Sequence, residues 1–186
     1  MARQATAVVD ANVLLNLATP VVDGRPKAPS GGDPFRAFLS TYDVHTPEYV
    51  LGEVSDALGS DDLLSAAAEA VVKASHHLTV HEVESGLDEP LEDGLDEGES
   101  RAIRLTNDLD ADLFVTDEFN NTNYLFVGIA LDDRNVQFTT PHVLCELAEH
   151  DVLDRNYIDA ALTYYVETKG WDEQYVELLR REFFAP

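Results

Sequence analysis

The chain has 186 residues, of which 45% are hydrophobic, so it is long enough to bury the core of one domain and too apolar to be disordered. Its 36 Asp and Glu residues against 12 Lys and Arg residues give a formal net charge of −24, which disfavours nucleic-acid binding through a basic surface. No apolar run approaches the ~20 residues that span a bilayer, and no signal peptide begins the chain, so we expect a cytoplasmic protein with no membrane segment.

The same charge predicts a strong dependence on salt. Only three of the basic residues are Lys, and an acidic, lysine-poor composition is typical of proteins from extreme halophiles. Self-repulsion at this charge density opposes the folded state in dilute buffer, whereas in molar salt the Debye length falls to about 3 Å and screens it. We therefore expect the protein to lose secondary structure on transfer from molar KCl to dilute buffer, as measured by circular dichroism. An unchanged spectrum would contradict this expectation.

Short runs of β-forming residues alternate with helical patterns along the chain. We expect strands at residues 5–10, 43–46, 78–83, 112–117 and 136–140. We expect helices at residues 47–59, 62–75, 97–109 and 141–150, and two further helices at 155–168 and 172–184. This alternation predicts an α/β fold with a central, mainly parallel sheet that helices cover on both faces.

Three segments lie outside this alternation. The segment "PVVDGRPKAPSGGDP", residues 20–34, is rich in Pro and Gly and is interpreted as a surface insertion after the first helix. Residues 82–98 hold many acids and no base, which predicts a solvated acidic loop. The last two helices, within residues 151–186, are amphipathic, and we expect them to form an extension that packs on the domain of residues 1–150 or on a partner.

Two acidic residues directly follow apolar strands. Asp10 ends "ATAVVD" and Asp117 ends "DLFVTD". An ionised carboxylate is costly to desolvate, so each of them either caps a helix or turn, or has a function at the mouth of the sheet. In open parallel sheets, ligands bind at the edge that the carboxyl ends of the strands form. Thr116 and Asn121 add polar groups beside Asp117.

A third acid lies on the apolar face of a helix. Thr46 and Pro47 are good residues to begin the helix over 47–59, with Thr46 as its N-cap. Glu53 follows Val50 by three residues and therefore shares the core-facing stripe of that helix. A Glu on such a face needs a partner, and none is visible in the sequence. Glu53 is therefore a candidate functional residue.

The start of the helix over 97–109 holds the fourth candidate. Asp96 and Glu99 have the spacing of a capping box, with Asp96 as N-cap and Glu99 as the third helical residue. Glu99 also precedes Ala102 by three residues and Ile103 by four, which places it on the face toward the sheet. Both interpretations stay open, and we favour Glu99 over Asp96 as the inward-facing acid.

These four acids come from two strand ends and two helices that begin near the same edge of the sheet. Four close carboxylates without a counter-charge repel one another and raise one another's pKa values. A hard divalent cation such as Mg²⁺ or Mn²⁺, which prefers oxygen ligands, would remove that repulsion. We therefore predict a site in which four acids are both metal ligands and catalytic groups: Asp10, Glu53, Glu99 and Asp117. Additional candidate ligands are Asp96, Asn121 and Thr116.

Taken in order, segments of this chain resemble those of PIN-domain ribonucleases, a family that includes the VapC-like toxins of toxin–antitoxin pairs. The segments are "VVDANVLLNL", the helix that carries Glu53, "GESRAIRLTNDLDADLFVTDE" and "VQFTTPHVLCELAE", within residues 5–150. The resemblance, to a VapC-like toxin or a related archaeal PIN protein, implies a Rossmann-like three-layer α/β/α fold and a Mg²⁺- or Mn²⁺-dependent site. Carried over by position, it makes Asp10, Glu53, Glu99 and Asp117 the acids of that site.

The resemblance also implies a reaction and its partners. It implies hydrolysis of single-stranded or structured RNA to products with 5′-phosphate and 3′-hydroxyl ends. An antitoxin protein and a second copy of the chain are candidate partners. The chain departs from a compact toxin in its insertion at 20–34, in its two extra C-terminal helices and in the lack of a basic patch.

Two other functions stay open at this point. The first is a catalytically inactive PIN-like module that binds RNA or a protein. The second is a phosphatase of the haloacid dehalogenase type, which also begins with an Asp at a strand end. That family has a second Asp two residues later, where this chain has Asn12.

Overall fold

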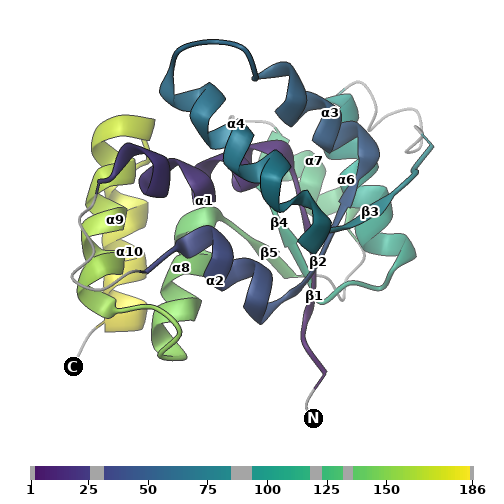
Figure 1. Cartoon of the computed structure of the whole chain (residues 1–186). Coiled ribbons are helices and arrows are strands. Elements are labelled where there is room, and N and C mark those ends of the chain that lie inside the picture. The colour runs from purple at the N-terminus through teal and green to yellow at the C-terminus, as the bar shows by residue number, and fades with distance from the viewer. Residues whose placement is uncertain (1–2, 26–31, 85–93, 118–122, 132–135, 185–186) are drawn as a thin grey trace.

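The computed structural model of this protein contains a five-stranded sheet in the order β3-β2-β1-β4-β5, in which every neighbouring pair of strands is parallel. The structure describes residues 3–25, 32–84, 94–117, 123–131 and 136–184. Helices cover both faces of the sheet (Figure 1), which confirms the predicted three-layer α/β/α fold. The strands are β1 (Thr6–Val9), β2 (Asp43–Pro47), β3 (Thr79–His81), β4 (Leu113–Val115) and β5 (Val136–Phe138).

The helices that the sequence predicts are all present. They are α3 (Glu48–Asp56), α4 (Leu63–Ala74), α6 (Glu97–Asp108), α8 (Thr140–Glu149), α9 (Arg155–Lys169) and α10 (Glu173–Phe184). Helix α1 (Ala11–Asp23) is the first helix, which was expected to precede the 20–34 segment. The structure also contains α2 (Pro34–Thr41), α7 (Asn123–Ala130) and a short 3₁₀ helix at Ser75–His77. In the part of the chain that the structure describes, none of these helices combines the length and the apolar character that crossing a bilayer requires.

Two cores lie on opposite faces of the sheet. Val9 and Val115 belong to the larger core, with residues of α1, α4, α8 and the two C-terminal helices. Val8 and Phe114 belong to the smaller core, with residues of α6 and α7. This division follows from the strand geometry, because successive side chains point to opposite faces of the sheet. Burial on both faces also explains why the central strands are continuous apolar runs.

The segment at 20–34 is only partly an insertion, which corrects the interpretation made from its composition. Helix α1 continues through Pro20 for its last turn, and α2 begins at Pro34. The side chain of Asp33 caps α2, and a Pro at the first helical position has a suitable φ and needs no N–H partner. Both ends of the Pro- and Gly-rich segment are therefore helical: its first residues belong to α1, and its last residue begins α2. Residues 26–31 lie outside the described part of the chain.

The acidic loop predicted at 82–98 ends earlier than predicted, before Glu97. Helix α6 begins at Glu97, which is helical because Asp96 caps the first turn. Residues 85–93 lie outside the described part of the chain, so the loop itself stays a prediction.

Thr46 has a different role from the one expected. It lies inside β2 instead of capping α3, and its buried hydroxyl donates a hydrogen bond to the Val9 carbonyl oxygen at 3.1 Å. Pro47 occupies the cap position of α3 without a side-chain hydrogen bond. Thr46 therefore joins the carboxyl end of β2 to that of β1, next to Asp10.

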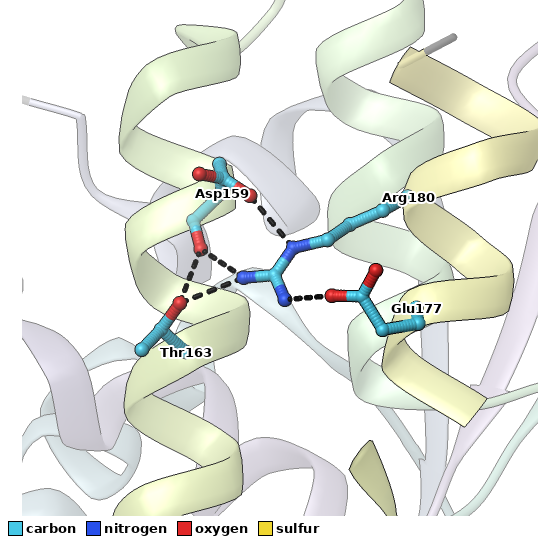
Figure 2. A network of polar contacts seen from close by, with 4 residues as sticks. All are labelled: Asp159, Thr163, Glu177 and Arg180. Atoms are coloured by element: carbon cyan, nitrogen blue, oxygen red, sulfur yellow. Dashed lines mark hydrogen bonds and ion pairs between the residues drawn. The ribbon is translucent and has the colours of Figure 1, made fainter. Parts of the chain in front are cut away.

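The C-terminal helices pack on the domain. Leu162 of α9 and Val176 of α10 are fully buried in the larger core. Arg180 of α10 joins the two helices (Figure 2): its Nε donates to Asp159 at 2.7 Å, and its Nη atoms donate to Thr163 and Glu177, each at 2.7 Å. The extension is therefore a continuation of the domain core, and the two helices lie beside α8 and one end of α1 in Figure 1.

Candidate active site

The order of the strands brings the two strand-end acids to neighbouring positions. β1 and β4 are adjacent and parallel, with Val9 opposite Val115, and Asp10 and Asp117 follow these residues. The Asp10 N–H donates to the Val115 carbonyl oxygen at 3.4 Å, which continues the pairing past the end of β1. Both acids therefore lie at the carboxyl edge of the sheet, where parallel α/β proteins bind ligands.

Asp10 is a buried helix cap. Its side chain is 4% exposed, and its Oδ1 accepts a hydrogen bond from the Val13 N–H at 2.8 Å. Asp is a favoured N-cap because its carboxylate satisfies a free N–H of the first turn and interacts well with the helix dipole. The capping interpretation of Asp10 is therefore confirmed, and the capping residue lies at the carboxyl edge of the sheet.

Glu99 takes part in a helix capping box and is also buried. Asp96 Oδ1 accepts from the Glu99 N–H at 2.8 Å, and Glu99 Oε2 accepts from the Asp96 N–H at 3.2 Å, which completes the capping box. Glu99 is 2% exposed, whereas Asp96 is exposed to solvent. Of the two acids, Glu99 is therefore the one that faces inward.

Glu53 lies against the first turn of α6. A Cβ atom built on Gly98 would be 2.6 Å from Glu53 Oε2 and 2.8 Å from Oε1, so only a residue without a side chain leaves room for this carboxylate. Glu53 is thereby placed beside the backbone that leads directly into Glu99. Burial, with the negative charges of Asp96, Asp56 and Glu97, raises the pKa of Glu53 to about 7. Negative charge is thus concentrated where α3 meets α6.

Replacing Gly98 by Ala should move the Glu53 carboxylate without unfolding the protein. The new methyl group would collide with the end of a flexible side chain, which can turn toward solvent. We expect the pKa of Glu53 to fall by about one unit as its desolvation is relieved, measured by NMR titration of the side-chain carboxyl. Gly52→Ala is the matched control, because a Cβ there meets nothing within 4 Å. Equal pKa values in the two variants would contradict the contact.

Asp117 is held by three hydrogen bonds from two elements. Its Oδ1 accepts from the Thr140 N–H at 2.8 Å, and its Oδ2 accepts from the Thr140 hydroxyl at 2.6 Å and from Asn16 Nδ2 at 2.7 Å. Burial raises the pKa of Asp117, although these hydrogen bonds and the charge of Lys169 act to lower it. Asp117 is therefore oriented by α1 and by the first residue of α8.

A proline in α1 connects Asp117 to the C-terminal helices. Pro20 has no N–H to donate to the Asn16 carbonyl oxygen, four residues earlier in the helix. The buried Tyr165 of α9 donates its hydroxyl hydrogen to that oxygen at 2.8 Å. The backbone of Asn16 is thus fixed by α9 while its side chain holds Asp117.

Two additional candidate ligands, Thr116 and Asn121, remain to be placed, and the structure describes only Thr116. Thr116 is fully buried, and its N–H donates to the Phe138 carbonyl oxygen at 3.0 Å, so it extends the pairing of β4 with β5. Asn121 lies outside the described residues. Sequence reasoning missed Asn16 and Thr140, which orient Asp117. The available signal for Thr140 was its place just after β5, because this strand ends at the same edge of the sheet.

The donor set fits a hard divalent cation in its chemistry. Three of the candidate side chains are buried or close to other negative charges, and a cation would offset the cost of ionising them together. Within residues 3–25, 32–84, 94–117, 123–131 and 136–184, no three acidic, His or Cys side chains are arranged to hold a metal ion as they lie. Ion binding therefore requires the carboxylates to turn toward a common point.

The structure brings the candidate acids together in two pairs: Asp10 and Asp117 follow neighbouring parallel strands, and Glu53 lies against the turn of α6 that leads into Glu99. The residues that orient Asp117 come from α1 and α8. Neither a scan against models of known protein families nor a search of curated proteins finds a match to this chain.

Proposed function

We propose that this protein is a divalent-metal-dependent endoribonuclease that cleaves phosphodiester bonds in single-stranded RNA. The observation that carries the proposal is the position of Asp10 and Asp117 at the carboxyl ends of the neighbouring parallel strands β1 and β4. The resemblance of the ordered segments to PIN-domain ribonucleases supports it.

Each acid has a defined contribution to this reaction. Asp10, Glu53, Glu99 and Asp117 would hold Mg²⁺ or Mn²⁺, which when bound stabilises charge on phosphate oxygens and lowers the pKa of a water molecule. The capping hydrogen bond of Asp10 and the three hydrogen bonds of Asp117 fix two of these carboxylates before substrate arrives. Preorganised charge of this kind is the largest contribution to many enzymatic rates.

Action as the toxin of a toxin–antitoxin pair is a narrower form of the same proposal. Nuclease activity alone does not require an antitoxin. An adjacent small open reading frame that encodes a DNA-binding partner would support this narrower form.

The direct test is cleavage of a generic single-stranded RNA in molar KCl with Mn²⁺ or Mg²⁺. We expect cleavage that EDTA abolishes, and products with 5′-phosphate and 3′-hydroxyl ends. The variant Asp10→Asn controls for a contaminating nuclease, because Asn still caps a helix while the charge is lost. It should be folded and inactive.

Failure of the wild-type protein across RNAs and both metals would refute the nuclease. Retained RNA binding would then favour the inactive binding module. A phosphorylated intermediate trapped on Asp10 would instead favour the phosphatase.

A further inference from the structure

Lys169 lies beside the acidic site although it is remote from it in sequence. It is the last residue of α9 and follows Tyr165 by four residues, so both side chains lie on one face of that helix. Tyr165 donates to Asn16, and Asn16 donates to Asp117. The last turn of α9 is therefore fixed next to Asp117.

The charge of Lys169 acts on the site. Burial raises the pKa of Asp117 and lowers the pKa of Lys169, and the opposite charges of the two groups act against both shifts. Helix α10 strengthens this arrangement, since the Tyr175 hydroxyl lies 2.8 Å from Thr139 Oγ1, one residue before Thr140. The C-terminal helices thus hold a cation at the carboxyl edge of the sheet.

Most other Lys and Arg side chains in the described residues form ion pairs with Asp or Glu. Six have a carboxylate oxygen within 4.0 Å, namely Arg3, Arg25, Lys73, Arg101, Arg104 and Arg180. Lys169 has no carboxylate oxygen within that distance among the described residues. Its ammonium therefore stays available to an anion that approaches Asp117.

We infer that Lys169 contacts a backbone phosphate of the nucleic acid that enters the acidic site. This inference rests on the proposed nuclease function, because it places the phosphate next to Asp117. A protein with a formal net charge of −24 repels a polyanion, and a cation at the site counters that repulsion locally. Lysine binds phosphate as a compact charge with three donors.

A structural role for Lys169 makes a different prediction. A Lys in the last turn of a helix interacts favourably with the helix dipole. That role would change the stability of α9 and leave the salt dependence of RNA binding unchanged. A phosphate contact changes the salt dependence, because each contact releases a counterion.

The test measures binding of a fluorescent single-stranded RNA oligonucleotide to the inactive Asp10→Asn protein by anisotropy. It is done with Mn²⁺ over the range of KCl in which circular dichroism shows the fold to be intact. Adding Lys169→Met should weaken binding and reduce the slope of log Kd against log[KCl] by about 0.7, the value for one phosphate contact on a single strand. Lys169→Arg should keep most of the slope. Lys73→Met, which removes a cation paired with Glu69 on α4, should change neither.

The outcomes separate this inference from the proposed function. If wild-type protein cleaves RNA and Lys169→Met keeps the original slope, the inference is wrong and the nuclease stands. If wild-type protein binds RNA through Lys169 without cleaving it, the nuclease is wrong and the phosphate contact stands. If the Asp10→Asn protein binds no RNA, the inference is overturned whatever the wild type cleaves.

Discussion

Asp117→Asn is expected to lower the rate of RNA cleavage by at least about a hundredfold, since even groups that only orient a metal ligand contribute 10–100-fold. The substitution removes the charge and also disturbs the hydrogen bonds. An Asn that keeps its oxygen toward the Thr140 N–H turns its NH₂ group toward the NH₂ group of Asn16, so two donors face each other. The rate is measured in molar KCl with Mn²⁺.

The exchange Asn16→Asp with Asp117→Asn separates these two effects. It restores one donor and one acceptor between the positions, so the thermal stability lost in Asp117→Asn should be recovered. Cleavage should not recover, because the carboxylate now projects from α1. Recovery of both stability and cleavage would show that Asp117 acts only through its hydrogen bonds.

Glu53 should make the stability of the protein fall as pH rises toward neutrality. Its pKa is raised from 4.5 to about 7 in the folded protein. Between these values the folded state retains a proton that the unfolded state has lost, so the free energy of unfolding decreases as pH rises and levels off above pH 7. Glu53→Gln removes this dependence and should be more stable than wild type at pH 8 by on the order of 1 kcal/mol, after allowance for solvent screening.

A divalent cation should reverse the effect of pH. At pH 8 the ionised Glu53 is available to Mn²⁺, and binding to the folded state raises the melting temperature. We expect this rise in wild-type protein and a much smaller one in Glu53→Gln, both measured by thermal denaturation in molar KCl. The matched substitution Glu48→Gln, at an exposed position of the same helix, should behave as wild type. Equal responses in all three proteins would contradict a metal site at Glu53.

The sequence was sufficient to predict the strands and their parallel arrangement. The apolar runs that end in Asp10 and Asp117 are buried on both faces, and such runs read clearly as strands. Helices α2 and α7 were not predicted. The first is short and begins at Pro34, inside a segment whose composition indicates a loop, and the second, "NYLFVGIA", has apolar residues without a clear helical period.

The candidate acids could be singled out because they interrupt apolar patterns, and their joint role as a site stays a prediction. The residues around them could not be singled out. Asn16 and Thr140 are ordinary polar residues in their own helices, and their contact with Asp117 spans 101 and 23 residues of sequence. Lys169 is equally ordinary at a helix end. Only the packing of α9 against α1 brings it to the site, and a single sequence contains no signal for that contact.

The missing N–H of Pro20 has a consequence for how this chain can be dissected. By leaving a backbone oxygen of α1 for Tyr165, it makes helix α9 a structural support for the second turn of α1. A truncation at residue 150 would expose the faces of α1 and α8 that the C-terminal helices bury, and it would remove the Tyr165 hydroxyl that donates to the Asn16 carbonyl oxygen. The folded unit that supports Asp117 therefore includes α9 and α10.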